Sequence, residues 1–261
     1  MKQRVFVTGA TGGMGFASLK EMLKDTDKQD IVILARDSEK NRSLLAPYLQ
    51  TKGLSVEWGD LNDYEVVKKC VKGCDLVLHI AAFVSPAADY YPERAMKVNY
   101  GSTKNIINAI YDCGQENSTR LVYIGTVAET GDRMPPIHWG RVGDPIKPSM
   151  FDYYAVSKVA AERLVIESGL KYWVSLRQTG IIGKAMSEIN DAIMFHNCFD
   201  NVLEYCSDRD SARAMKNLCA FFHDGTLPEE FWGHIYNIGG GPSCRTDTYS
   251  MFKVLYGEIG L

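Results

Sequence analysis

Apolar runs alternate with segments of helical period through the first two thirds of the chain. Short apolar runs bounded by turn residues predict strands at residues 5–8, 31–35, 55–58, 76–80, 121–124 and 173–177. The segments between them repeat their apolar residues with a helical period and predict helices at residues 15–24, 64–71, 95–113 and 154–168. This alternation is typical of βαβ units. We therefore predict an α/β fold, a doubly wound parallel sheet of the Rossmann type with helices on both faces.

The pattern changes after residue 180. We predict helices at residues 192–206 and 212–222, a short strand at 235–238 and a last helical segment at 249–261. We therefore divide the chain into a sheet domain at residues 1–180 and a small second region at residues 181–261. The last segment has no evident cap, which is compatible with a natural chain that continues beyond Leu261.

The composition is that of an ordinary soluble globular protein, with 261 residues of which 46% are hydrophobic and 23% charged. A formal net charge of −3 leaves no basic face, so we expect neither nucleic acid nor a membrane surface as a partner. Uninterrupted apolar runs of about 18 residues do not occur, and we expect a cytoplasmic protein. The 7 cysteines are scattered without a C-x-x-C pair, which favours reduced thiols and no metal site.

The first apolar run ends in a glycine-rich loop, Thr8-Gly9-Ala10-Thr11-Gly12-Gly13-Met14-Gly15. Glycine permits a tight turn and the close approach of a phosphate, while the N-terminus of a following helix presents free N–H donors and a partial positive charge. We predict that this loop binds a dinucleotide cofactor. The predicted contacts are Gly9, Thr11, Gly12, Gly13, Met14 and Gly15. The other interpretation is a turn that only packs a helix on a strand.

The residues after the second and third strands are candidates for the adenosine end of that cofactor. Arg36 offers a charged fork to a ribose 2′-phosphate, whereas an acidic residue there would accept from a free 2′-hydroxyl. We therefore predict NADP and keep NAD as the alternative, because Asp37 follows directly. Asp60, followed by Leu61, is placed to accept from the adenine amino group. The other interpretation is that Asp60 or Asn62 is the N-cap of the helix that begins near Tyr64.

The fourth predicted strand ends in His79-Ile80-Ala81-Ala82. Ala81 and Ala82 are small and would let the cofactor's ribose approach the backbone. His79 is expected to be a hydrogen-bonded core histidine and not a catalyst.

Tyr154-Ala155-Val156-Ser157-Lys158 carries the predicted chemistry. Tyrosine and lysine four apart on a helix share one face, and an ammonium near a phenol favours the phenolate, lowering a pKa that is ordinarily about 10. Such a phenol takes the proton from an alcohol as its hydride leaves, or returns it to a carbonyl. Thr126, after the fifth strand, would hold the same substrate oxygen. Its other interpretation is a strand-end turn residue.

With these residues in place, the chain resembles the extended short-chain dehydrogenase/reductase family, a group of NAD(P)-dependent epimerases, dehydratases and reductases. The resemblance covers nearly the whole chain. It rests on the glycine loop, Gly59-Asp60-Leu61, His79-Ile80-Ala81-Ala82, Val98-Asn99-Tyr100, Thr126 followed by Gly131, Tyr154 with Lys158, the segment from Leu176 to Gly183, and Tyr236-Asn237-Ile238-Gly239-Gly240-Gly241.

The resemblance implies roles for the catalytic residues. Tyr154 would be the acid/base, Lys158 would lower its pKa and bind the nicotinamide ribose, and Thr126 stands where the family has serine or threonine. Asn99 would maintain the geometry of the active site.

For the cofactor, the resemblance implies that the backbone of Thr179, Gly180 and Ile181 receives the nicotinamide carboxamide. This chain has Gln178 where the family usually has proline, and Arg36 where NAD-using epimerases carry an acidic residue. Arg36, together with Ala82-Phe83-Val84-Ser85-Pro86, makes the chain look more like the NADP-dependent carbonyl reductases of the group.

Under this interpretation residues 1–180 form an NAD(P)-binding domain and residues 181–261 bind a small-molecule substrate. Candidate substrate contacts are His138, Trp139, Arg141, Asn190, His196, Tyr205 and Arg245, for which surface exposure or helix packing is an equal explanation. The helices at 95–113 and 154–168 carry more apolar residues than one sheet contact needs, which is compatible with a homodimer.

Three functions are compatible with these residues. The first is an NADP(H)-dependent oxidoreductase acting on a secondary alcohol or ketone, and the second is a sugar-nucleotide epimerase that retains NAD. A dehydratase needs a carboxylate next to the hydroxyl residue, and Glu129 lies two places too late in the sequence. The third is a non-catalytic dinucleotide sensor, disfavoured because both Tyr154 and Lys158 are present.

Overall fold

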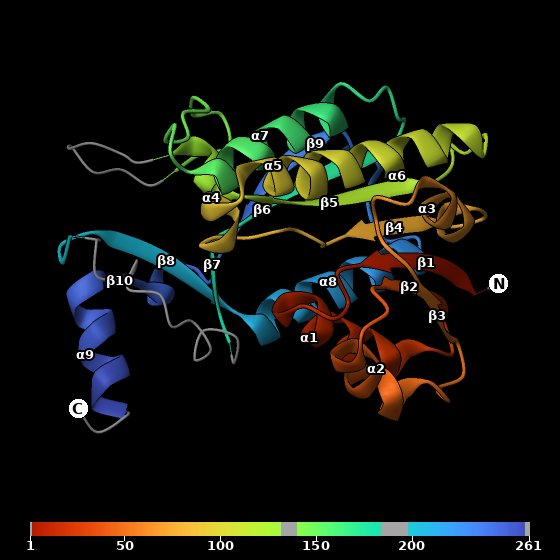
Figure 1. Ribbon diagram of the computed structural model, residues 1–261, viewed down its shortest axis with the longest axis horizontal. Coiled ribbons are helices and arrows are strands. Elements are labelled where there is room, and N and C mark those ends of the chain that lie inside the picture. Colours follow the sequence, from red (N-terminus) through yellow and green to blue (C-terminus); the bar gives the residue numbers. More distant parts are fainter. Residues whose placement is uncertain (1, 132–139, 184–197, 259–261) are drawn as a thin grey trace.

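The computed structural model describes residues 2–131, 140–183 and 198–258. Its centre is a sheet of seven parallel strands in the order β3-β2-β1-β4-β5-β6-β9 (Figure 1). These strands are β1 (Gln3–Thr8), β2 (Gln29–Ala35), β3 (Leu54–Trp58), β4 (Leu76–His79), β5 (Arg120–Thr126), β6 (Trp173–Gln178) and β9 (His234–Ile238). Each predicted strand lies on one of them, and the predicted fold class is confirmed. The central strands are almost wholly buried because helices cover both faces.

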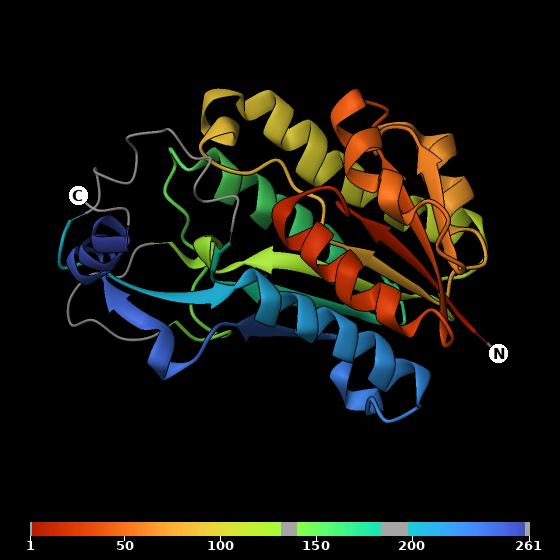
Figure 2. The same ribbon diagram turned by 90° about the horizontal axis from the view of Figure 1, so that it is seen from below.

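Helices form a layer on each face of the sheet (Figures 1 and 2). One layer holds α3 (Tyr64–Val71), α6 (Gly101–Asp112) and α7 (Tyr153–Ile166), and the other holds α1 (Gly13–Met22) and α8 (Asp208–His223), which pack side by side, with α2 (Glu39–Leu45) nearby. Side chains alternate between the two layers, as the pleat of a strand requires. Val5 and Val7 pack with Leu19 and Met215, whereas Phe6 joins the core under α6 and α7.

The predicted helix at residues 95–113 is built in pieces. It consists of α5 (Pro92–Ala95), a π-helical turn η3 (Met96–Tyr100) and α6, and is preceded by α4 (Ala87–Tyr90). The wider π turn contains Asn99. Such turns occur often at functional sites.

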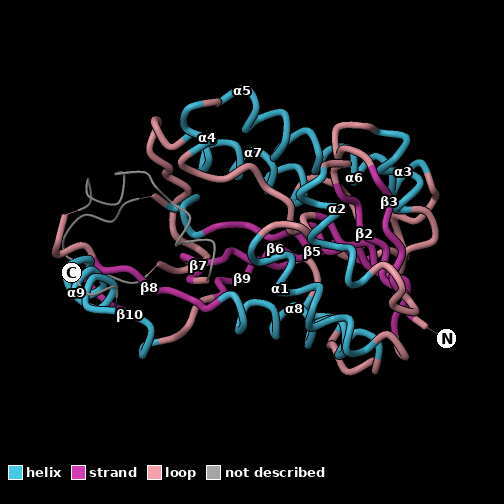
Figure 3. The backbone as a smooth tube through the Cα atoms, turned by 60° about the horizontal axis from the view of Figure 1, so that its bottom comes forward, coloured by secondary structure: helices cyan, strands magenta, loops and turns pink. Residues whose placement is uncertain are grey.

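A second, three-stranded sheet lies beyond the carboxyl ends of the main strands (Figure 3). It contains β7 (Gly180–Ile182), β8 (Val202–Ser207) and β10 (Arg245–Asp247), and is followed by α9 (Thr248–Glu258). The predicted helix at 192–206 is therefore wrong for residues 198–206, whereas its residues 192–197 lie outside the described part of the chain. This short apolar run has no distinguishing period, and its pairing with β7 and β10 makes it a strand.

Residues after 180 contribute to both sheets. β9 forms the edge of the main sheet beside β6, and α8 packs on α1, whereas β8, β10 and α9 belong to the second unit. The boundary at residue 180 therefore does not separate the two sheets. Within the part of the chain that the structure describes, every helix falls short of the length and apolarity needed to cross a bilayer.

Candidate functional site

The glycine loop connects β1 to α1 through close backbone contacts. A Cβ on Gly15 would lie 2.0 Å from the Gly9 carbonyl oxygen, and one on Gly9, where φ is +72°, would lie 2.7 Å from the Ala81 nitrogen. Gly12 is the N-cap of α1 and offers no side-chain acceptor to its first turn. The loop thus leaves backbone N–H groups for an anion, beside the point between β1 and β4 where the strand order reverses. These features fit the phosphates of a dinucleotide.

A buried hydrogen-bond network holds the ends of β1 and β4 together. His79 Nδ1 lies 2.8 Å from Thr8 Oγ1, and His79 Nε2 lies 3.0 Å from Thr103 Oγ1. Thr8 Oγ1 accepts from the Ala81 N–H at 3.1 Å, and Thr103 donates to the Asn99 carbonyl at 2.7 Å. Burial, with the Lys158 charge second, lowers the pKa of His79 to about 3, so it is neutral. His79 is a hydrogen-bonded core residue, as predicted.

At the end of β2, Arg36 is exposed and Asp37 is paired elsewhere. Arg42 Nε and Nη2 contact the two Asp37 carboxylate oxygens at 2.6 and 2.8 Å. The Arg42 guanidinium also lies 4.6 Å from the centre of the Trp58 ring. The charge of Asp37, which complicated the cofactor prediction, is therefore balanced by Arg42.

After β3, Asp60 and Leu61 form a turn on the same edge. Asp60 Oδ1 accepts from the backbone and side-chain nitrogens of Asn62 at 2.8 and 2.7 Å. The N-cap of α3 is Asp63, so neither Asp60 nor Asn62 has the capping role that was the other interpretation.

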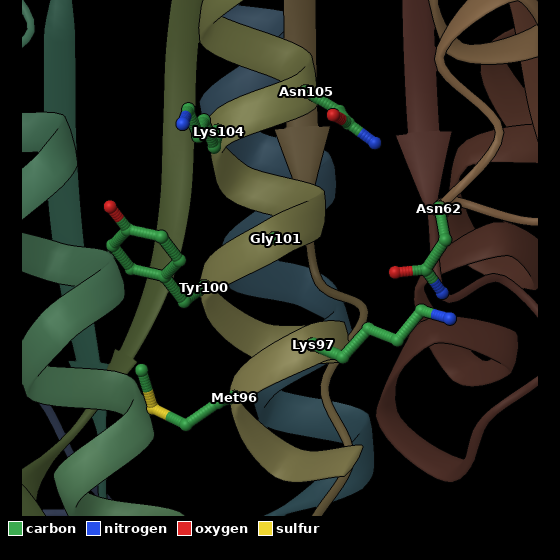
Figure 4. Close-up of a pocket in the computed structure, with 7 residues that line it drawn as sticks. All are labelled: Asn62, Met96, Lys97, Tyr100, Gly101, Lys104 and Asn105. Carbon is green, nitrogen blue, oxygen red and sulfur yellow. The ribbon is translucent and has the colours of Figure 1, made fainter. Parts of the chain in front are cut away.

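An open pocket of about 420 Å³ lies beside this turn, against the π turn and α6 (Figure 4). The Lys97 side chain reaches toward Asn62 across it (Figure 4). The lining residues are Asn62, Met96, Lys97, Tyr100, Gly101, Lys104 and Asn105. None of the predicted catalytic side chains lines this pocket.

Thr126 and Tyr154 meet at the carboxyl end of β5. Asp152 caps α7 by accepting from the Ala155 N–H at 2.8 Å, which places Tyr154 in the first turn. Thr126 Oγ1 accepts from the Ala128 N–H at 3.3 Å, and the Thr126 hydroxyl is near enough to the Tyr154 phenol to act on its pKa. Burial raises the pKa of Tyr154 above its ordinary value of 10, and the Thr126 hydroxyl opposes that rise. Strand end and helix start thus bring the two predicted partners together.

Lys158 lies beneath these residues and is 2% exposed. Its Nζ donates to the Ile124 carbonyl at 2.7 Å and lies 4.1 Å from the centre of the Tyr123 ring. Burial lowers the pKa of Lys158, which Glu129 and Glu162 oppose. Burial dominates the pKa of the phenol, the ammonium is engaged by the Ile124 carbonyl, and the lowering of the Tyr154 pKa by Lys158 stays a prediction.

Asn99 connects three segments around Tyr154. Its Oδ1 accepts from the Phe83 N–H at 2.7 Å, and its Nδ2 donates to the Phe83 carbonyl at 3.0 Å and to Ser157 Oγ at 2.8 Å. Ser157 in turn donates to the Tyr154 carbonyl at 2.7 Å. Asn99 therefore fixes the loop after β4 against the first turns of α7.

The predicted nicotinamide end lies where β6 passes into β7. The Thr179 N–H donates to the Ile238 carbonyl at 3.0 Å. Gln178 Nε2 and Thr179 Oγ1 are buried and have no hydrogen-bond partner among the described residues. Gly180 and Ile181 follow in β7. Two unpaired polar groups beside Thr126, which is in register with Gln178, fit the amide of a nicotinamide.

The predicted substrate contacts are only partly described. Arg245 Nε pairs with Glu204 at 2.8 Å, and Glu204 also accepts from the Gly241 N–H at 3.0 Å. Tyr205 is a buried residue of β8, not of a helix, and Arg141 is exposed. His138, Trp139, Asn190 and His196 lie outside the described residues.

Sequence reasoning missed a buried charged cluster behind Thr126. Glu129, Glu162 and Arg177 are each at most 3% exposed, and Arg177 Nη2 lies 2.5 Å from Glu162 Oε2. The Thr-x-x-Glu spacing of Thr126 and Glu129 is a capping-box signal that could have located Glu129. Because its carboxyl group points inward, Glu129 cannot serve as the substrate-facing carboxylate of a dehydratase.

The described residues hold no group of three or more His, Cys, Asp or Glu side chains placed to bind a metal ion.

A model of the family described as "NAD dependent epimerase/dehydratase family" matches residues 5–239. The chain is 30% identical to a 3 beta-hydroxysteroid dehydrogenase/Delta 5-->4-isomerase of Vaccinia virus (strain Ankara) over 276 residues, covering 95% of this chain and 74% of that protein. It is 31% identical to the protein of the same name from Mycobacterium tuberculosis (strain CDC 1551 / Oshkosh), covering 98% of this chain and 59% of that protein.

Two solved structures share the fold. A double mutant of DesIV, a dTDP-glucose 4,6-dehydratase from Streptomyces venezuelae with NAD bound, has a TM-score of 0.79 and 21% identity, covering 99% of this chain and 81% of that chain. A UDP-N-acetylglucosamine 4-epimerase from Methanobrevibacter ruminantium M1 has a TM-score of 0.73 and 18% identity, covering 100% and 84%. The chain belongs to the NAD dependent epimerase/dehydratase family, which confirms the predicted family and enzyme class.

Proposed function

We propose that this member of the NAD dependent epimerase/dehydratase family is an NADP(H)-dependent oxidoreductase that interconverts a secondary alcohol and a ketone. The observation that carries the proposal is that the Thr126 hydroxyl and the phenol of Tyr154 meet at the carboxyl edge of the sheet, where the hydroxyl acts to lower the pKa of the phenol. Thr126 Oγ1 already accepts from the Ala128 N–H, so its own hydrogen is available for the phenol oxygen. Tyr154 would hold the exchanged proton on that oxygen, and Thr126 would orient it.

The proposed cofactor, when bound, supplies hydride transfer. The residues that would hold it are Gly9, Thr11, Gly12, Gly13, Met14, Gly15, Arg36, Asp60, Leu61, Ala81, Ala82, Tyr154, Lys158, Thr179, Gly180 and Ile181. NADP is proposed over NAD because Arg36 is exposed and Asp37 is already paired with Arg42. Arg36 and Arg42 together carry two positive charges against the one negative charge of Asp37, and this excess of positive charge suits a 2′-phosphate.

The proposed substrate is an alicyclic secondary alcohol of the hydroxysteroid type. The names of the two sequence relatives support this class. Arg245, a candidate contact for an anionic group, is paired with Glu204, which supports an uncharged substrate over a sugar nucleotide. A homodimer and a cytoplasmic location stay predictions.

The test combines cofactor titration with one substitution. NADPH should bind more tightly than NADH in a fluorescence titration, and oxidation of a 3β-hydroxysteroid should appear as absorbance of the reduced cofactor. Tyr154→Phe should lower kcat by about 100-fold or more while leaving the cofactor Kd within about twofold, because only the proton-exchanging group is lost.

Three results would contradict the proposal. Undiminished turnover by Tyr154→Phe would remove its acid/base role, and tighter binding of NADH would remove the role of Arg36. NAD that stays bound through purification would favour the retained-cofactor epimerase.

A further inference from the structure

The charged cluster behind Thr126 joins three elements of the fold. Glu129 belongs to the short 3₁₀ helix η4 (Val127–Thr130), Glu162 to α7, and Ser175 and Arg177 to β6. The side chain of Glu129 is fully buried, and Arg177 Nε lies 3.4 Å from its Oε2. The packing is tight, since a Cβ on Gly125 would lie 2.9 Å from Ser175 Oγ and 3.3 Å from Glu129 Oε1.

The two carboxyl groups of this cluster face one guanidinium, since Arg177 Nε lies 3.0 Å from Glu162 Oε1 and 3.4 Å from Glu129 Oε2. Ionised carboxylates only accept hydrogen bonds, and two of them buried side by side repel each other, so one proton between the two groups stabilises the pair. The number of donors decides which group carries it. Glu162 accepts from Ser175 Oγ at 2.6 Å and from Arg177 Nε at 3.0 Å, with Arg177 Nη2 as a third donor. The negative charge is therefore stabilised on Glu162.

Glu129 has fewer donors. Its Oε1 accepts from the Thr126 N–H at 3.1 Å, whereas its Oε2 has no donor in hydrogen-bond geometry among the described residues. An ionised Glu129 would leave that buried oxygen unsatisfied, but a protonated Glu129 becomes a donor toward Glu162. Burial, followed by Glu162, raises the pKa of Glu129, which agrees with this assignment.

The Thr126 contact links this carboxyl group to the site. Glu129 Oε1 holds the Thr126 N–H while the Ala128 N–H holds Thr126 Oγ1, a reciprocal capping box around η4. These two bonds fix the backbone and the hydroxyl of Thr126, whose hydrogen is left for Tyr154.

We propose that Glu129 is a positioning residue for Thr126 and Tyr154, and that it acts as a neutral carboxylic acid sharing one proton with Glu162. The part of this proposal that concerns the reaction rests on the function proposed above, whereas the shared proton does not. The titratable and charged groups that face Glu129 are Glu162, Lys158 and Tyr154 from α7, Arg177 from β6 and Tyr123 from β5.

The proposal predicts a pH effect of defined sign. As pH rises and Glu129 loses its proton, two adjacent carboxylates repel and the hold on Thr126 loosens. The new negative charge also raises the pKa of Tyr154. Activity should therefore fall on the alkaline side, and Glu129→Gln should move that fall to higher pH, because a carboxamide keeps both hydrogen bonds and does not ionise.

The first arm of the test is infrared spectroscopy of the full chain at pH 7, which needs no substrate. The wild-type protein should show the carbonyl band of a buried protonated carboxylic acid. Glu129→Gln should lose that band, and the exposed control Glu230→Gln should keep it. A wild-type spectrum without the band, or a band that survives in Glu129→Gln, overturns the shared proton.

The second arm is steady-state kinetics. Glu129→Gln should keep kcat within about threefold of wild type, whereas Glu129→Leu, which removes both hydrogen bonds, should lower kcat about tenfold with an unchanged KM for the cofactor. Equal losses in the two variants, or an unshifted alkaline limb in Glu129→Gln, overturn the positioning role. If the wild-type protein shows no hydride transfer, the proposed function is overturned instead. The infrared arm still decides whether Glu129 carries the proton.

Discussion

Two buried polar clusters lie behind the carboxyl edge of the main sheet, and they differ in how their polar atoms are hydrogen-bonded. The His79 cluster is neutral, and both ring nitrogens meet threonine hydroxyl groups. The Glu129 cluster is charged. Among the described residues, it leaves Arg177 Nη1 and Glu129 Oε2 without hydrogen-bond partners. The neutral network is satisfied and fixes the backbone near the glycine loop. In the charged cluster some atoms lack partners, and the protonation of its carboxyl groups therefore responds to changes in the surroundings.

The largest expected effect comes from breaking the charged cluster. Arg177→Met would leave the Glu162 charge buried without its main partner, and the free energy of unfolding should fall by about 3–5 kcal/mol. Urea denaturation measures this. The control is Arg163→Met, which removes an exposed pair with Glu167 and should change stability by less than about 1 kcal/mol. Similar small losses in both variants would show that the buried cluster is not an ion pair of this kind.

The neutral cluster should instead respond to acid. The pKa of His79 is depressed in the folded protein, so its stabilising contribution is complete above pH 6.5 and is lost as pH falls from 6.5 toward about 3. Each pH unit below 6.5 should lower the free energy of unfolding by roughly 1.4 kcal/mol. Denaturation measured across this pH range should show that the free energy of unfolding depends less steeply on pH in His79→Gln than in the wild type. The control is the exposed His234→Gln, which should behave like the wild type. Identical slopes would mean that His79 is not buried as a neutral ring.

The smallest expected effect is the loss of one hydroxyl from the neutral cluster. Thr103→Val removes the partner of His79 Nε2 and should lower the free energy of unfolding by about 1 kcal/mol. The loss is limited because Ser102 Oγ lies 3.4 Å from the same nitrogen and offers a replacement. Thermal denaturation against the exposed control Thr226→Val checks this value. A loss as large as that of Arg177→Met would contradict the distinction between the clusters.

Local pattern predicted most of the fold and the placement of two candidate site residues. Strand positions followed from apolar runs, and the meeting of Thr126 with Tyr154 followed from a strand end and a helix start at the same edge of the sheet. The sequence failed for β8, because a short apolar run fits a strand or a helix until its neighbours are known. It also did not predict that the ammonium of Lys158 donates to a carbonyl of β5.

By itself, the sequence determined the parallel sheet and the glycine loop and selected the candidate site residues, because these depend on residue type and on short spacings. Only the tertiary structure decided the partners and protonation of Glu129, Glu162 and Arg177. Those residues come from three elements separated in the chain, and their charges depend on burial and on the donors that packing brings to each oxygen.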